Sequence, residues 1–500
     1  MLDQAPEHQA REFAAAFRDF LDWVHSPAAG AGEGNEVSAL VGHFLGPDGT
    51  QHSVVTRDLP PFEHVNLQTA LDAWSARAGR TVEVRGIALP SHYGGLSLQQ
   101  LVAGEALPPL RLTAPALADL PNGPGSTLGC LRLALLLVTD QHGRCVVMIQ
   151  APNEHQPGLQ VEVAGLPVGL AQRLLAELDQ LRAELSVYRG HLLDVSLTPM
   201  GGVALTFAGP PGIGRDDVVL PATTLARAER HALGVADHRQ ALLAAGQHLK
   251  RGLLLYGPPG TGKTHTTRYL LGQMTGYTRL VLTGRTLVAV GAVTDLARAL
   301  LPAVVVLEDV DLVAEERSLG PASSPVLFDL LDAMDGAAPD ADLLFLLTTN
   351  RADLLEPALA ARPGRVDVAV EIALPDAPAR ERLLTLYGQN VPLALTDEDV
   401  NLAVERTDGV TASFLKELIR RSVLESLHDD PVLTAVTGVH LARALDDLLD
   451  AAQAVTRTLL GVGVDPADLP VGGALPPGPG RGWMAYGHRG MPRRFGQYRG

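Results

Sequence analysis

The sequence has little cysteine and little lysine. Only Cys130 and Cys145 occur in 500 residues, which excludes a framework of disulfide bonds. No CxxC spacing surrounds them, so we interpret both as buried apolar residues and not as metal ligands. Lysine occurs only at Lys250, Lys263 and Lys416, whereas lysine and arginine together number 40. We attribute this excess of arginine to a coding bias.

Long apolar segments and an excess of positive charge are also missing. Apolar runs such as 133–138 and 304–307 are far shorter than the ~20 residues that cross a bilayer. The acidic N-terminus does not resemble a secretion signal, so we expect a cytoplasmic protein without a membrane span. The formal net charge of −16 disfavours a general nucleic-acid or membrane-surface binder, because both need a basic excess.

Composition and periodicity divide the chain into five parts. With 46% hydrophobic residues the chain can bury sizeable cores, and its length suggests about three domains. Strand-like runs on both sides of 140–143 predict a hairpin, and leucines at helical spacing predict a helix over 166–187. The predicted parts are an N-terminal helix and linker (1–35), an α+β region (36–210), an α/β core (211–375), a helical region (376–460) and a disordered Gly/Pro/Arg-rich tail (461–500).

Apolar runs alternate with helical stretches from residue 252 onward. This alternation predicts a parallel sheet with crossover helices. A helical stretch at 216–250 precedes it, and only helices are expected from 377 to about 460, one of them starting after Thr396. The predicted fold class is therefore α/β, followed by a helical domain and preceded by an α+β region. We expect the strands of the sheet at 253–256, 280–283, 304–307, 343–348 and 368–372.

The stretch 257–264, GPPGTGKT, fits the phosphate-binding pattern G-x-x-x-x-G-K-[ST] between a strand and a helix. Its glycines let backbone N–H groups converge on phosphate oxygens, and the helix N-terminus adds partial positive charge. Lys263 can reach the β- and γ-phosphates, and the Thr264 hydroxyl can bind Mg²⁺. We predict that ATP is bound by Gly257, Pro258, Pro259, Gly260, Thr261, Gly262, Lys263, Thr264 and His265.

Acidic, amide and basic residues follow the later strands. The run 304–307 leads into Glu308 and Asp309, where a P-loop ATPase needs a carboxylate near the metal. Asn350 ends the next strand, and its amide could hold the attacking water. Arg362 and Arg365 flank a turn, and an arginine can stabilise phosphoryl transfer in its own subunit or in a neighbour. A solvated surface loop is the alternative for these two arginines.

Together these motifs resemble the AAA ATPases (ATPases associated with diverse cellular activities) over residues 216–455. The resemblance implies a P-loop NTPase domain with a helical lid, in a homo-oligomeric ring that is usually a hexamer. It also implies that Mg²⁺-dependent ATP hydrolysis remodels, unfolds or disassembles a protein client, selected directly or through an adaptor by the N-terminal region. The matching segments are 257–264 (Walker A), 304–311 (Walker B), 330–336, 348–351 (sensor 1), 357–365 and 407–413 (sensor 2 region).

The resemblance assigns a role in catalysis to each of the candidate site residues that follow the phosphate loop. Glu308 supports the metal together with Thr264, Asp309 activates water, and Asn350 positions that water. Two arginine fingers, Arg362 and Arg365, would act on the ATP of the neighbouring subunit.

Three positions depart from the family pattern. The usual acidic order is Asp-Glu, but this chain has Glu308-Asp309. The branch that includes the mitochondrial ATPase that translocates folded Rieske protein also has the order Glu-Asp. The stretch 287–291 has no aromatic residue where protein-threading relatives carry one. No arginine occurs near Ala412 and Ser413, so an arginine-type sensor 2 is not expected. If the Glu-Asp order leaves hydrolysis negligible, the alternative function is an ATP-binding, nucleotide-gated scaffold or regulator.

The segment 470–500 contains five arginines, interleaved aromatic residues and no acid. It is interpreted as a disordered solubilising tail, a partner-binding tail, or a segment that binds single-stranded nucleic acid by charge and stacking. The net charge of the whole chain disfavours the last interpretation.

Overall fold

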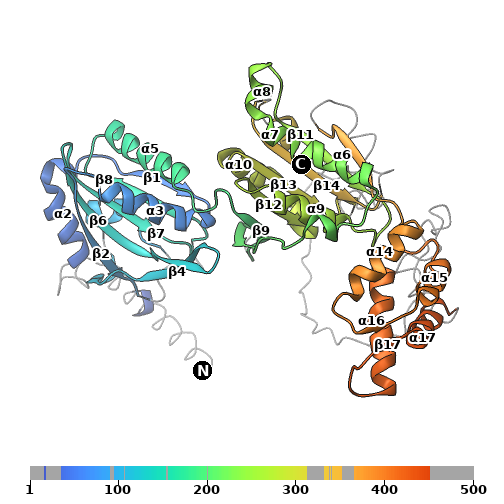
Figure 1. Ribbon diagram of the computed structural model, residues 1–500. Helices are drawn as coiled ribbons and strands as arrows, with labels where there is room; N and C mark the ends of the chain where they lie inside the picture. Colours follow the sequence, from blue (N-terminus) through green and yellow to red (C-terminus); the bar gives the residue numbers. More distant parts are fainter. Residues whose placement is uncertain are drawn as a thin grey trace, which may run out of the picture.

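The computed structural model describes residues 16–18, 35–90, 95–105, 107–153, 156–199, 201–311, 331–336, 338, 340–351 and 365–450. Most of the expected N-terminal helix, the turn that carries Arg362 and the C-terminal tail lie outside these residues. The described residues form an N-terminal α+β domain, an α/β domain and a helical domain in chain order (Figure 1). None of their helices is long and apolar enough to cross a membrane.

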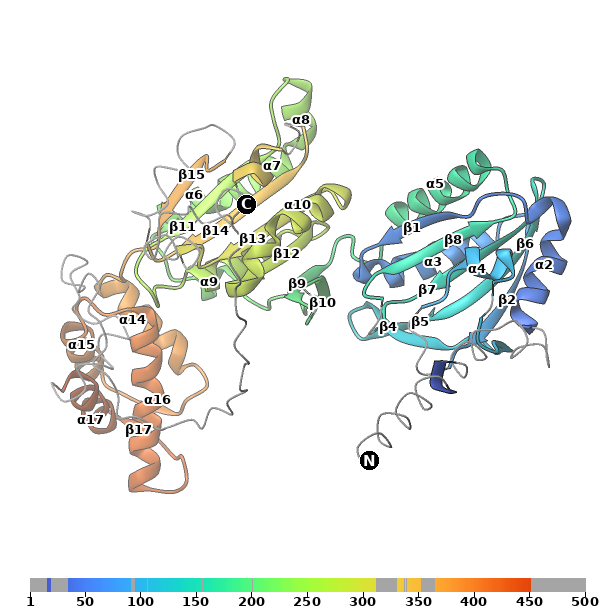
Figure 2. The ribbon, with the colours of Figure 1, turned by 180° about the vertical axis from the view of Figure 1, so that it is seen from behind.

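The N-terminal domain is a six-stranded antiparallel sheet in the order β1-β8-β7-β6-β2-β3, with helices on both faces (Figure 2). Alternate residues of β6 enter different cores: Leu136 and Val138 face helices α3 and α5, and Leu135 and Leu137 face α2 and α4. A strand buried on both faces is apolar throughout, which explains the continuous run in the sequence. The elements are α2 (Glu36–Gly49), β1 (Val55–Leu59), α3 (His64–Ser75), β2 (Thr81–Ala88), α4 (Leu98–Ala103), β3 (Arg111–Thr113), β6 (Leu133–Asp140), β7 (Gly143–Gln150), β8 (Leu159–Ala164) and α5 (Val168–Glu184).

Two sequence predictions for this domain are confirmed. Strands β6 and β7 pair as an antiparallel hairpin that turns between Asp140 and Gly143, and α5 spans most of the expected helix. A second hairpin, β4 (Leu117–Gly123) with β5 (Ser126–Leu131), forms a separate two-stranded sheet that the sequence analysis did not predict.

The α/β domain contains all five expected parallel strands. They are β11 (Arg251–Tyr256), β12 (Thr278–Thr283), β13 (Ala303–Glu308), β14 (Leu343–Thr349) and β15 (Val368–Glu371). Helices α6 (Ala222–Ala232) and α9 (Lys263–Gln273) pack on one face and α10 (Val290–Ala299) packs on the other. Strands β13 and β14 are buried on both sides, which gives them the uninterrupted apolar runs.

The sheet has two further strands that the sequence analysis assigned to the preceding region. The hairpin β9 (Leu192–Leu197) and β10 (Val203–Phe207) continues the sheet, whose order is β10-β9-β12-β13-β14-β11-β15. Strand β9 pairs in parallel with β12. The expected domain boundary at residue 210 therefore lies after two strands that belong to the sheet of the α/β domain. The sequence did not indicate this, because β9 pairs with β12, which lies about 90 positions later in the chain.

The expected helical stretch at 216–250 is interrupted. It contains a short 3₁₀ turn (Arg215–Asp217), α6, α7 (Gly234–Asp237) and α8 (Arg239–Ala244). Pro221 precedes α6 with an extended backbone, and Gly246 adopts a left-handed φ of 68° after α8. Both residue types favour helix ends over helix interiors, and this accounts for the short helices.

The C-terminal domain packs four helices: α14 (Ala377–Gly388), α15 (Asp397–Arg406), α16 (Ala412–Asp429) and α17 (Gly438–Leu449). The expected start of α15 is confirmed, because the Thr396 side chain accepts a hydrogen bond from the Asp399 backbone N–H. The expectation of helices alone was incomplete. A two-residue pairing joins β16 (Leu393–Ala394) to β17 (Val436–Thr437).

Candidate nucleotide site

The glycine-rich loop connects β11 to α9 and depends on three glycines with positive φ. Gly257, Gly260 and Gly262 have φ values of 146°, 78° and 107°. A Cβ at Gly257 would lie 2.2 Å from the Ile372 carbonyl oxygen, and one at Gly260 would lie 2.9 Å from Ser413 Oγ. A Cβ at Gly262 would meet nothing within 4 Å, so the loop is open at this point. The loop therefore packs closely on its neighbours and leaves space for a ligand against its backbone.

A cavity of about 540 Å³ lies between this loop and the helical domain, and we call it the nucleotide cavity. Its wall combines the loop and the start of α9 with residues of α14 and α16. Segment 217–220, which precedes α6, closes another side. His265 also lines the cavity, and its Nε2 lies 3.0 Å from the Asp217 carbonyl oxygen.

Lys263 is the first residue of α9 and is only 6% exposed. Its Nζ donates hydrogen bonds to the carbonyl oxygens of Gly257 and Pro258, each over 2.8 Å. Burial lowers the pKa of this ammonium to about 8, against the opposing attraction of Asp309 and Asp311. A buried cation inside an open glycine loop fits the phosphates of a nucleotide.

Glu308 ends β13, and its carboxyl lies near the Thr264 side chain. Burial, followed by the nearby charge of Asp309, raises the pKa of the Glu308 carboxyl, while Arg268 and Thr264 oppose that rise. A hydroxyl and a carboxylate are oxygen ligands of the kind that Mg²⁺ prefers. Their proximity is compatible with the predicted metal site, although Thr264 lines the nucleotide cavity and Glu308 lines a neighbouring one.

Asp309 is the only non-glycine residue with a positive φ, 53°, in the part of the chain that the structure describes. Its backbone N–H donates to Thr348 Oγ1 over 3.0 Å, and the next N–H, of Val310, donates to the Thr348 carbonyl over 3.0 Å. This left-handed turn brings Asp309 into the lining of the nucleotide cavity. Burial, followed by the charge of Asp311, raises the pKa of the Asp309 carboxyl.

Asn350 follows β14 and faces two of the acids. Its Nδ2 lies 3.5 Å from Asp309 Oδ1 and 3.4 Å from Asp311 Oδ2. Asp311 is 5% exposed and also accepts hydrogen bonds from the Asn350 backbone and the Thr349 hydroxyl. The sequence analysis gave Asp311 no role, although it is the third acid of the Glu-Asp-Val-Asp motif. The structure shows that it holds Asn350 beside Asp309.

Comparisons with known proteins agree with this geometry. Residues 253–374 match the family described as "ATPase family associated with various cellular activities (AAA)". The chain contains an AAA ATPase domain. The family and the α/β P-loop fold class predicted from the sequence are therefore confirmed.

Individual relatives match between about two fifths and nine tenths of the chain. The ATP-dependent zinc metalloprotease FtsH of Alkalihalophilus pseudofirmus is 32% identical over 232 residues, which cover 43% of this chain and 33% of FtsH. The human ATPase family gene 2 protein homolog A is 26% identical over 453 residues, which cover 88% of this chain and 48% of that protein. The chain thus spans less than half the length of either relative. The solved AAA domain of FIGL-1 has a TM-score of 0.41 at 25% identity and covers 51% of this chain and 92% of that structure.

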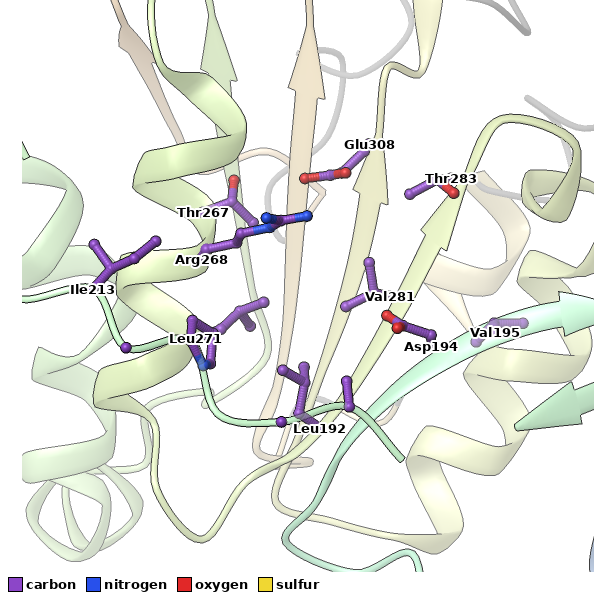
Figure 3. Close-up of a pocket in the computed structure, with 14 residues that line it drawn as sticks. Leu192, Asp194, Val195, Ile213, Thr267, Arg268, Leu271, Val281, Thr283 and Glu308 are labelled. Atoms are coloured by element: carbon purple, nitrogen blue, oxygen red, sulfur yellow. The ribbon is translucent and has the colours of Figure 1, made fainter. Parts of the chain in front are cut away.

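A second cavity, of about 570 Å³, lies beside the nucleotide cavity of the AAA domain (Figure 3). Strand β9, segment 208–213, α9 and the ends of β12 and β13 enclose it. Arg268 lines both cavities, and Figure 3 shows its guanidinium extending from α9 toward Glu308. Asp194 of β9 faces the same space. No motif in the sequence indicated Arg268 or Asp194.

Only one of the two predicted arginine fingers, Arg365, lies in the described part of the chain, and it is not at the chain's own nucleotide cavity. Arg362 lies outside the described residues. Arg365 is 8% exposed, and its Nε and Nη2 donate to the two carboxylate oxygens of Asp335 over 2.9 and 2.7 Å. Arg365 is also absent from the lining of the cavity. A contact with a neighbour's ATP would therefore require this ion pair to open.

Proposed function

We propose that this chain hydrolyses ATP to ADP and phosphate with Mg²⁺, in a homo-oligomeric ring that is a hexamer, and uses the reaction to remodel a protein client. The observation that carries the proposal is the arrangement of Lys263, Asp309 and Asn350 around one cavity under the helical domain, which is the expected lid. The AAA domain and its relatives support the ATPase part. Cytoplasmic location stays a prediction from the sequence.

Each side chain has a task that follows from its contacts. The Lys263 ammonium binds phosphate oxygens, and Thr264 and Glu308 hold the metal. When bound, Mg²⁺ neutralises part of the charge that develops on those oxygens. Asp309 accepts a proton from the water that attacks the γ-phosphorus, and Asn350 holds that water. The bond from the γ-phosphorus to the bridging oxygen breaks, which releases ADP.

The ring assigns tasks to the remaining groups. Arg362 and Arg365 would stabilise phosphoryl transfer in the neighbouring subunit, after Arg365 leaves Asp335. The six-stranded N-terminal domain would select the client or its adaptor. Nucleic acid is not the expected partner, because the chain is strongly acidic.

One observation favours the second candidate function, a nucleotide-gated scaffold with little hydrolysis. The acid that lines the cavity is Asp309, which is one methylene shorter than glutamate and held in a left-handed turn. Such a base reaches less far toward an attacking water. Arg365 is also engaged within its own chain.

The decisive experiment is steady-state ATP turnover of the full chain beside Lys263→Ala over a range of protein concentrations. The proposal predicts turnover that vanishes in the variant and rises cooperatively with concentration, because the fingers act between subunits. ATP binding without turnover above the variant supports the scaffold. Absence of ATP binding refutes both candidates.

A further inference from the structure

The second lysine of the nucleotide cavity is on the lid. The chain has three lysines among 40 basic residues, and two of them, Lys263 and Lys416, line the same cavity. The third, Lys250, lies elsewhere and donates to the Met334 carbonyl over 2.8 Å. An ammonium is a compact point charge on a flexible stem and offers three hydrogen-bond donors.

Helix α16 brings Lys416 to the cavity because its first turn rests on the glycine-rich loop. The Ser413 backbone N–H and hydroxyl both donate to the Gly260 carbonyl oxygen, over 3.1 and 3.3 Å. The N-cap residue Thr411 accepts a hydrogen bond from the Phe414 N–H and fixes the start of the helix. Lys416 follows Ser413 by three positions, so both lie on the same side of the helix.

Lys416 is available for a ligand. It is exposed, and among the described residues its ammonium makes no recorded hydrogen bond or ion pair. The nearest acid on its helix, Glu417, is already held by Arg420 and Arg421 at 2.6 and 3.1 Å. The acids that line the cavity, Asp217 and Asp309, come from other elements.

We propose that Lys416 binds the phosphate chain of the nucleotide from the lid side. This inference rests on the proposed function. A lysine ammonium only donates hydrogen bonds and carries a full charge, which suits phosphate oxygens. Its helix is docked on Gly260, within the loop that is expected to hold those oxygens. The lid therefore contributes a cation to nucleotide binding from a position that the sequence motifs did not identify.

The test is calorimetric binding of MgATP, MgADP and adenosine to the full chain, with Lys416→Gln, Lys416→Arg and the control Arg420→Gln. We expect Lys416→Gln to bind MgATP about tenfold more weakly, as for the loss of one charge-assisted hydrogen bond at a solvated site. Its binding should depend less on salt than that of the wild type. Lys416→Arg should recover most of the affinity, and Arg420→Gln should match the wild type.

Two results overturn the inference. One is MgATP affinity of Lys416→Gln equal to that of Arg420→Gln. The other is an equal loss for adenosine, which would place the contact on the base or ribose. Failure of the proposed function looks different, because MgATP would then not bind to the wild type or would bind equally to Lys263→Ala. Thermal unfolding of each variant shows whether the lid stays folded.

Discussion

Replacement of Asp309 by asparagine is expected to remove most ATP turnover while ATP binding persists. The Asp309 carboxylate lines the cavity beside Asn350, whereas Glu308, the proposed metal-side acid, lines the second cavity. Asparagine has nearly the same shape and tolerates the left-handed φ of 53° as well as aspartate does. The substitution therefore removes the proton acceptor and leaves the turn intact.

The size of the effect follows from the role of a general base, which contributes about 10²- to 10⁴-fold to a rate. ATP affinity should stay equal or increase, because Asp309 attracts the Lys263 ammonium and repels phosphate. Alanine is a poorer choice, since a Cβ without a polar group costs roughly 1–2 kcal/mol in a left-handed backbone. That strain would confuse a catalytic loss with a folding defect.

The assay is single-turnover hydrolysis with a parallel measurement of ATP binding. Glu308→Gln is the informative comparison, and Asp397→Asn, at the exposed start of α15, is the control for a lost surface charge. Glu308→Gln should lose both Mg²⁺-dependent binding and turnover. The assignment is refuted if Asp309→Asn keeps more than about a tenth of wild-type turnover, since a general base contributes far more than that. Glu308 would then be the base.

Three further predictions concern stability, pH and the arginine finger. Asp342→Ala should lower the free energy of unfolding by about 3–5 kcal/mol in urea titrations, because it leaves the buried Arg251 guanidinium without its ion pair; a cost below about 1 kcal/mol, as for an exposed pair, contradicts this. Burial lowers the pKa of His64, so its imidazole is protonated less readily in the folded state than in the unfolded chain. Protonation of the unfolded chain below about pH 6.5 therefore lowers the free energy of unfolding. The difference in the free energy of unfolding between pH 7.5 and 5.5 should therefore be smaller in His64→Gln than in the wild type. An unchanged difference would show that His64 does not contribute to the pH dependence of stability. If Arg365 acts on a neighbour's ATP, Arg365→Ala should reduce turnover at least about tenfold more than Asp335→Ala does, whereas equal losses indicate a structural ion pair.

The parts of the fold that the sequence predicted well depend on local or repetitive patterns. Strands β13 and β14 are apolar over 303–307 and 343–347 because helices cover both faces, so their approximate bounds were visible without knowledge of the sheet. The glycine-rich loop was equally clear, since its glycines, lysine and threonine are adjacent in the chain. The start of α15 was predicted from one capping residue, Thr396.

The parts that were missed depend on distant partners. Nothing near Arg365 indicates that Asp335, thirty positions earlier, will hold its guanidinium. The turn at Asp309 is compatible with aspartate but not required by it, and it exists because Thr348 of the neighbouring strand accepts the N–H. Lys416 belongs to no motif, and only the packing of α16 on Gly260 brings it to the cavity.

The hairpin β9–β10 and the residues just before it connect the N-terminal domain to the parallel strands of the AAA domain. The Tyr188 hydroxyl donates to the Phe62 carbonyl over 2.6 Å, and the Tyr188 ring lies 5.7 Å from that of Phe207 in β10. Separation of the domains would leave that hydroxyl without its partner, at a cost of about 1–3 kcal/mol for a buried polar group. Strand β9 then pairs with β12, and β12 pairs with β13 up to Thr283 and Glu308. Each step from Phe62 to Glu308 is therefore a strand pairing or a side-chain contact, and only two strand pairings separate β9 from Glu308.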